Sequence, residues 1–208
     1  ENRQSHCAGT ADHDCRTPAA VLTRSVTELG IPSLSDPEVL GGMGSERSAV
    51  TDVLVAEALA HGDMGQAVAC LAPSAVRTAP VLWGNADQQS TYLPAFVGES
   101  VPAAALTVLE PHVLFDPFAL KTTAKRTSSG FVLDGVKSLV PRADTAELFV
   151  VGASLDGAPA LFLLESGTTG VTVESEPAMG LRAASMGRLH LNSVKVPATA
   201  LLASGTDY

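Results

Sequence analysis

With 208 residues, of which 46% are hydrophobic and 17% charged, the chain can bury one large core or two small ones. Its net charge is −9. The nearest approach to a basic cluster is formed by Lys121, Lys125 and Arg126, whose spacing is that of a solvated strand face. Duplex nucleic acid is therefore not an expected partner. No apolar run reaches the ~20 residues that span a bilayer, and the N-terminal segment ENRQSHCAGTADHDC does not have the pattern of a secretory signal. We expect a cytoplasmic protein without a membrane span.

The N-terminal segment contains side chains that are good zinc ligands, namely His6, Cys7, His13 and Cys15. The CxxC and HxxxH spacings are missing, however, and the segment is polar and terminal. The three cysteines of the chain are an odd number, which does not indicate a disulfide framework. We predict a flexible tail over residues 1–16 and no metal site.

Apolar residues then recur at helical spacing, which predicts a helical domain over residues 17–100. The first helix should follow Thr17 as N-cap, with Pro18 in its first turn, and should stop at Gly30. A second helix, capped by Ser45 or Ser48, should end at Gly62. The pattern predicts a third over residues 65–82, kinked by Pro73 unless that proline falls in the first turn, and a short fourth from Asp87 to Pro94.

Beyond Pro102 the pattern changes to short runs of β-type residues. Seven strands are predicted, with the sequences AALTVL, LKTTAKR, GFVLDGVKSLV, ELFVVGA, PALFLLE, GVTVES and RLHLNSVKV. Asp134-Gly135 indicates a tight turn, and Ser129-Gly130, Asp156-Gly157 and Thr169-Gly170 are weaker turn signals. The even spacing of these strands favours a small antiparallel barrel or sandwich over residues 101–203, followed by the start of a linker at 204–208. No GxGxxG follows a strand, so a Rossmann nucleotide site is not supported, and the fold class is α+β in two domains.

Several short motifs occur in the order and at roughly the spacing of one known family. They are PEVLGGMG (37–44), VLVAEALAHGD (53–63), WGNADQQSTYLPAFVGE (83–99), Glu110-Pro111 with Asp116, FVLDGVKSLV (131–140) and MGLRAASMGRLHLNSVKVPATALL (179–202). Taken together, across most of residues 28–203, they resemble the N-terminal helical and middle β domains of the acyl-CoA dehydrogenases. Within these motifs, Gly41 and Gly42 are expected to supply positive φ angles in a turn, and Arg182 is expected to stabilise a turn.

The resemblance implies an FAD-dependent oxidoreductase of fatty acid metabolism that desaturates an acyl-CoA thioester between its α and β carbons. In the family a carboxylate removes the α proton while the flavin accepts a hydride from the β carbon. The base is a glutamate of the C-terminal helical domain, and the sequence ends at Tyr208, where that domain would begin. We therefore expect no catalytic residue within 1–208, an inactive fragment, and an intact protein that forms homo- or hetero-oligomers of related subunits.

The resemblance also assigns the segments that would face FAD. Leu109 stands where the family has a threonine whose hydroxyl contacts the flavin, and Phe115 stands where it has a serine near the phosphates. Leu139-Val140-Pro141 replaces a W/F-I-T segment. Backbone amides and apolar packing would then have to hold the ring, and the candidate cofactor-binding residues are Leu106, Thr107, Val108, Leu109, Phe115, Leu139, Val140 and Pro141.

Three functions remain open from the sequence. The intact protein is a divergent flavin-dependent dehydrogenase, or a catalytically degenerate subunit that supports an active partner in a heteromeric assembly, or a CoA-thioester binding module without a redox role. The altered hydroxyl positions favour the second reading, and the β-domain motifs suit the first two. An acidic surface is compatible with CoA, because the CoA phosphates need only local cations.

Overall fold

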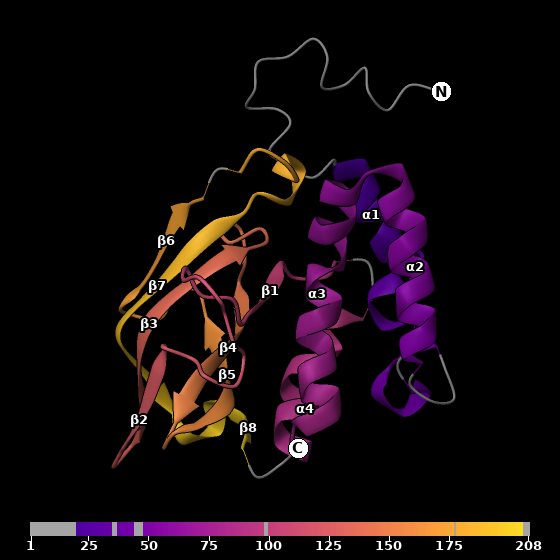
Figure 1. Ribbon diagram of the computed structural model, residues 1–208. Coiled ribbons are helices and arrows are strands. Elements are labelled where there is room, and N and C mark those ends of the chain that lie inside the picture. Colours follow the sequence, from indigo (N-terminus) through magenta and orange to yellow (C-terminus); the bar gives the residue numbers. More distant parts are fainter. Residues whose placement is uncertain (1–19, 35–36, 44–47, 98–99, 177, 206–208) are drawn as a thin grey trace.

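The computed structural model describes residues 20–34, 37–43, 48–97, 100–176 and 178–205. A helical layer lies against a sheet, with α3 and α4 nearest to the strands and α1 and α2 further out (Figure 1). The helices are α1 (Ala20–Glu28), α2 (Ala49–Gly62), α3 (Met64–Trp83) and α4 (Ala86–Tyr92), with short 3-10 turns η2 (Ile31–Ser33), η3 (Glu38–Leu40) and η4 (Leu93–Phe96). The four predicted helices are confirmed in order.

Side-chain caps explain where these helices begin. Ser48 Oγ accepts the Thr51 N–H at 3.2 Å, which selects Ser48 as the cap of α2. Asn85 and Gln88 form a capping box at the start of α4. Gly30 follows α1 in the left-handed conformation, with φ 67°, as a helix stop requires. The predicted caps Thr17 and Ser45 lie outside the described residues.

Pro73 lies in the interior of α3 rather than in its first turn, and the helix continues through both Pro73 and Pro80. Each proline removes one backbone donor, but α3 is the central helix and packs against α2 and β1, so tertiary burial outweighs the lost hydrogen bonds. In the 37–43 turn, Gly41 has a positive φ of 79°, whereas Gly42 does not. Among the described residues, no helix combines the length and apolarity needed to cross a membrane.

The sheet has eight strands, one more than predicted. They are β1 (Ala104–Thr107), β2 (Thr123–Thr127), β3 (Gly130–Val140), β4 (Leu148–Leu155), β5 (Ala158–Glu165), β6 (Val171–Ser175), β7 (Gly187–Pro197) and β8 (Leu201–Ser204). The order is β6-β7-β3-β2-β4-β5-β8, and β1 pairs with β4 beside this path. Within the described residues the path does not close, so the sheet is sandwich-like rather than a barrel.

Two pairings depart from the expected antiparallel pattern. Both β1 and β2 pair with β4 in parallel, β1 beside residues 148–151 and β2 beside residues 154–155. Because β5 occupies the other edge of β4 along its whole length, β1 and β2 must follow one another along the same edge. This arrangement brings the chain after β1 to the end of β3, where the candidate site lies.

The prediction of a tight turn at Asp134-Gly135 was wrong. β3 runs through both residues, and the register against β7 shifts there, as in a β-bulge. Gly135 has φ 152°, and a Cβ at this position would come within 2.6 Å of Thr122 Oγ1, so only glycine fits. Asp134 accepts the Ser193 N–H at 2.7 Å. The Asp156-Gly157 signal is confirmed as a two-residue hairpin with positive φ at both positions.

The buried hydrophobic side chains form two clusters. One lies within the sheet, where the rings of Phe131 and Phe162 meet edge to face at 5.1 Å. The other joins the layers and includes Val76 of α3 and Val150 of β4. Gln88 adds a polar link, since its Nε2 donates to the carbonyls of residues 199 and 201 at 2.9 Å. The helical layer is therefore fixed against the β1–β4 side of the sheet.

Candidate functional site

Two predicted segments that are 30 residues apart in the sequence meet at one edge of the sheet. The Ser138 N–H donates to the Leu109 carbonyl at 3.0 Å, and Lys137 Nζ donates to the Val108 carbonyl at 3.1 Å. These bonds hold the 106–109 segment, at the end of β1, beside the 138–141 segment at the end of β3.

A buried ion pair lies directly beneath this junction. Lys137 Nζ is 2.8 Å from Glu110 Oε1, and the two side chains are 0% and 1% exposed. The Glu110 carboxylate also accepts the backbone N–H groups of Lys121 at 2.7 Å and Thr122 at 2.8 Å. His112 Nε2 lies 3.1 Å from Glu110 Oε2. Every oxygen of the carboxylate is thus bonded, as a buried charge requires.

These bonds decide the protonation of the pair. Burial raises the pKa of Glu110, but the Lys137 ammonium and the backbone donors of Thr122 and Lys121 outweigh it and lower the pKa to about 2. Burial lowers the pKa of Lys137, and the Glu110 carboxylate opposes that change. Glu110 is consequently ionised at neutral pH and would be a weak proton acceptor, so its function here is to anchor the chain.

Three leucines of the meeting segments present their side chains at the surface. Leu106, Leu109 and Leu139 are 38%, 44% and 46% exposed, and we call this set the leucine edge. Such apolar surface suits a flat aromatic or aliphatic ligand rather than a charged one.

The other predicted residues are arranged differently. The Thr107 hydroxyl is buried and donates to the Val150 carbonyl at 3.1 Å, and Val140 belongs to the core of the sheet, so both side chains point inward. The carbonyl of Val108 is bonded to Lys137. The Phe115 ring packs against His112, with ring centroids 5.8 Å apart, in a loop where Leu114 is 92% exposed and has a φ of 56°.

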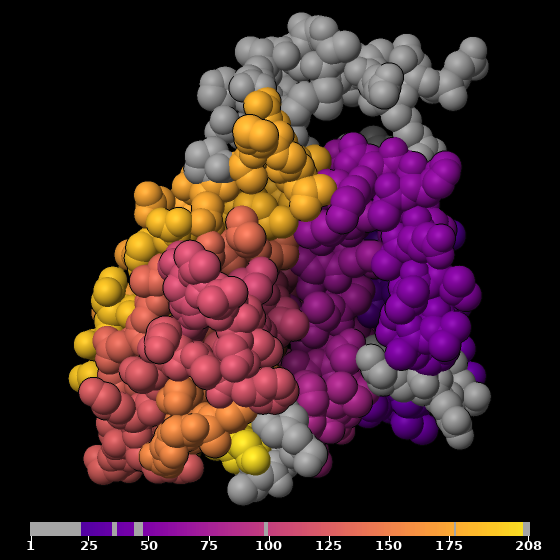
Figure 2. Space-filling view, viewed as in Figure 1, coloured from indigo at the N-terminus to yellow at the C-terminus, as the bar shows by residue number. Residues whose placement is uncertain are grey.

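An apolar groove opens beside the leucine edge, at the seam where the helical layer meets the strands (Figure 2). Its volume is about 410 Å³, and small and aliphatic side chains line it: Ala56, Ala60, Met64, Ala67, Val68, Leu71, Ala72, Ala75, Leu106 and Pro141. Pro141 and Leu106 are thus shared between the groove and the two meeting segments. The alanines give no signal of a groove in the sequence, because an alanine-rich helix surface has the same pattern whether it packs against protein or lines a groove.

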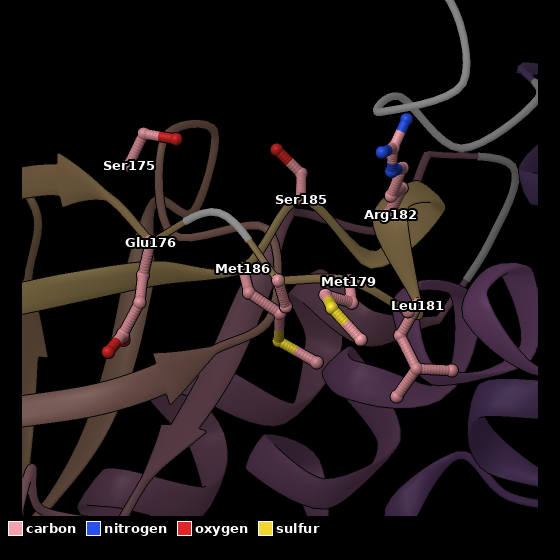
Figure 3. A pocket seen from close by; sticks show the side chains of 9 residues that line it. Ser175, Glu176, Met179, Leu181, Arg182, Ser185 and Met186 are labelled. Atoms are coloured by element: carbon pink, nitrogen blue, oxygen red, sulfur yellow. The ribbon is translucent and has the colours of Figure 1, made fainter. Parts of the chain in front are cut away.

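A second hollow, of about 290 Å³, lies where β6 leads into η5 (Arg182–Ala184) (Figure 3). Ser185 and Arg182 point to one side of it, while the side chain of Glu176 points the other way (Figure 3). The Glu176 carboxylate accepts the Leu139 N–H at 2.8 Å and the Ser138 hydroxyl at 2.7 Å. No sequence motif indicated that Glu176 would reach the leucine edge from another strand.

In the part of the chain that the structure describes, His, Cys, Asp and Glu side chains form no group of three or more that could hold a metal ion. The predicted zinc candidates at positions 6, 7, 13 and 15 lie outside that part. The arrangement is therefore an apolar edge and groove that rest on a buried polar anchor.

Comparison with known proteins identifies this arrangement. The family model "Acyl-CoA dehydrogenase, middle domain" matches residues 103–194, and "Acyl-CoA dehydrogenase, N-terminal domain" matches residues 2–100. The mitochondrial short/branched chain specific acyl-CoA dehydrogenase of Rattus norvegicus is 34% identical over 166 residues, which cover 76% of this chain and 38% of that protein. A probable acyl-CoA dehydrogenase of Bacillus subtilis is 31% identical over 187 residues, 87% of this chain and 31% of that protein.

Solved structures agree with these sequence matches. Butyryl-CoA dehydrogenase from Megasphaera elsdenii superimposes with a TM-score of 0.81 at 28% identity, over 94% of this chain and 53% of that one. An acyl-CoA dehydrogenase from Bacillus anthracis, complexed with FAD, gives a TM-score of 0.77 at 30% identity, over 88% of this chain and 32% of that one. The chain thus spans less than half the length of the rat relative, and it belongs to the acyl-CoA dehydrogenase family, matching its N-terminal and middle domains.

Proposed function

We propose that the protein is a flavin-dependent acyl-CoA dehydrogenase, in which this chain provides the surface for the flavin ring and one wall of the acyl site. The observation that carries the proposal is the direct continuity between the leucine edge and the apolar groove, which share Leu106. Desaturation needs the acyl chain and the hydride acceptor to lie in contact, and a groove that begins at the edge meets this requirement.

The residues present suit the ring of FAD better than its polar groups. Leu106, Leu109 and Leu139 offer partly exposed aliphatic surface on which an aromatic ring can pack. The polar backbone groups nearby are engaged, since the Leu109 carbonyl accepts from Ser138 and the Leu139 N–H donates to Glu176. When bound, FAD would supply the acceptor for the hydride, and the leucines would orient the ring and exclude water from one of its faces.

The apolar lining of the groove favours a substrate whose acyl chain is apolar and either unbranched or carries a small branch. None of its ten lining residues is charged. An acyl chain that ends in a carboxylate would lose hydration there without gaining a partner, which is unfavourable. The acyl-CoA is accordingly proposed to have an aliphatic chain.

The base for the α proton is proposed to come from outside residues 1–208. Glu110 is bonded on both oxygens and has a pKa of about 2, and Glu176 is bonded to Ser138, Leu139 and Arg188. Neither carboxylate near the edge is free to accept a proton from a substrate. We therefore expect residues 1–208 alone to be inactive.

A second candidate function is a catalytically degenerate subunit of a heteromeric assembly. It is favoured by Leu109 and Phe115, which stand where the resemblance places hydroxyl groups. Exposed apolar side chains on α2 also suit a subunit contact, since Val50, Val53 and Leu54 are 70%, 65% and 60% exposed. A CoA-thioester binding module without a redox role is the third candidate.

Titration of FAD and of an aliphatic acyl-CoA against the full protein, each followed separately, discriminates the three. The dehydrogenase binds both ligands and reduces an artificial electron acceptor. The degenerate subunit binds FAD tightly only when its partner subunit is added. The binding module takes up acyl-CoA without flavin. If the full protein binds neither ligand, the proposed function is wrong.

A further inference from the structure

The side chain of Glu176 connects three separate parts of the sheet. It follows the end of β6, and its carboxylate accepts from the Ser138 hydroxyl at 2.7 Å, from the Leu139 N–H at 2.8 Å and from Arg188 Nη2 of β7 at 2.6 Å. Figure 3 shows its side chain pointing away from those of Ser185 and Arg182, two other residues that line the hollow. Glu176 is thus directed at the β3 segment rather than at a ligand in that hollow.

The residue that Glu176 holds has an unfavourable backbone conformation. Leu139 has a φ of 52°, in the left-handed region, which a branched, non-glycine residue seldom adopts. Arg142, three residues on, has a φ of 51°, and its N–H donates to the Ala184 carbonyl at 2.8 Å. Such conformations persist only where surrounding contacts enforce them, and they gather at functional sites. The 139–142 path therefore depends on bonds from outside its own strand.

The same bonds reach the other half of the leucine edge. Ser138, whose hydroxyl is held by Glu176, donates its N–H to the Leu109 carbonyl. Arg188 stands on β7 directly opposite Glu174 and turns its guanidinium to Glu176. One carboxylate thereby fixes the backbone on which both Leu139 and Leu109 are presented.

We propose that Glu176 is a positioning residue for the flavin-facing edge, an inference that rests on the function proposed above. Its carboxylate keeps Leu139 in the left-handed conformation, so that the Leu139 side chain stands out at the edge and Pro141 reaches the groove. Without the carboxylate, Leu139 relaxes to an ordinary backbone conformation, and the apolar surface for the ring is displaced while the rest of the sheet stays folded.

Glu174 provides a matched control on the same strand. It is also paired, with Oε2 3.2 Å from His190 Nε2, but its side chain is 65% exposed, and its partner lies on β7 rather than on the 138–141 segment. Glu174→Ala should leave flavin binding within about twofold of wild type, because exposed pairs contribute little. Glu176→Ala should weaken FAD binding about ten- to hundredfold, as expected for the loss of several charge-assisted bonds. Glu176→Gln, which keeps one acceptor oxygen, should lie between them.

The experiment is an FAD titration of the full protein and the three variants, followed by flavin fluorescence, with circular dichroism to verify folding. Amide hydrogen exchange of Leu139 in the flavin-free proteins is a second readout, and it should accelerate in Glu176→Ala and not in Glu174→Ala. Folded Glu176 variants that bind FAD as wild type does, with unchanged exchange, overturn the inference and leave the proposed function standing. A wild-type protein that does not bind FAD overturns the proposed cofactor site and this role with it. If Glu176→Ala does not fold, Glu176→Gln decides.

Discussion

The buried anchor and the leucine edge lie within a few residues of each other and differ in almost every physical property. The anchor pairs Glu110 with Lys137, both fully buried and both hydrogen-bonded to neighbouring backbone groups. The edge presents Leu109 and Leu139, partly exposed and without a side-chain polar group. Glu110 and Lys137 also match motifs that resemble the family, whereas Leu109 departs from them. On the function proposed above, the framework that carries the site matches the family, and the divergence of this chain lies in the surface offered to the ligand.

The anchor should give the largest effect on stability. Lys137→Met would leave the Glu110 carboxylate buried without its cation, and we expect a loss of about 3–5 kcal/mol in the free energy of unfolding. Lys125→Met, on the exposed side of β2, is the control and should change stability by about 0.5 kcal/mol or less. Denaturant unfolding measures both. A loss below about 1 kcal/mol for Lys137→Met would mean that the pair does not hold the two segments together.

The contribution of the Glu110–Lys137 pair to the free energy of unfolding should depend on pH, by an amount nearly as large as the effect of Lys137→Met. Because the folded-state pKa of Glu110 is lowered from 4.5 to about 2, its contribution is fully present above pH 4.5 and is lost as the pH falls towards 2. By linkage this contribution reaches up to about 3 kcal/mol. Glu110→Gln should therefore be less stable than wild type at pH 7, and the gap should narrow between pH 4.5 and 2. A gap that stays constant over this range would contradict the lowered pKa.

Much of this fold follows from the sequence, for identifiable reasons. The helix start at Ser48 and the hairpin at Asp156-Gly157 depend on neighbouring residues only, and local patterns predict such features well. The fourth helix begins at Ala86, one residue before the predicted Asp87, because Asn85 and Gln88 cap it. The Asp134-Gly135 signal failed because its glycine is required by the close approach of Thr122, the residue just before the neighbouring strand β2, rather than by a turn.

The candidate site was predicted less completely than the fold. The segments 106–109 and 138–141 could be named from the resemblance, but side-chain direction could not, so Thr107 and Val140 were included although they point inward. Glu176 and the groove were missed because they depend on how β6 and α3 pack against the edge. Such contacts are long-range and carry no local signature.

The next prediction concerns the groove and its effect on the affinity for acyl-CoA. Ala60→Phe should fill part of the groove, and each methylene of an acyl chain kept out of it forfeits about 0.8 kcal/mol. The affinity for acyl-CoA should then fall more for long chains than for short ones. Ala58→Phe, on the same helix but lining a different hollow with Leu54 and His61, should leave the chain-length dependence unchanged. Calorimetric titration with a series of acyl-CoA esters measures this, and equal effects of the two variants would remove the groove from the acyl site.

The smallest effect concerns the leucine edge itself. If the missing hydroxyl groups limit flavin affinity, Leu109→Thr with Phe115→Ser should tighten FAD binding about fivefold or more, since a net hydrogen bond contributes about 1 kcal/mol. Leu106→Thr is the control: Leu106 has similar exposure on the same edge, but the resemblance implies no hydroxyl there, so this change should only remove apolar contact. Flavin fluorescence, recorded during titration of the full protein, measures all three proteins. Tight, stoichiometric binding by wild type would exclude the degenerate subunit, because backbone and apolar contacts would then suffice. If wild type instead binds FAD weakly and the double variant binds it tightly, the divergence of this chain lies in two side chains, on a framework otherwise competent to hold the cofactor.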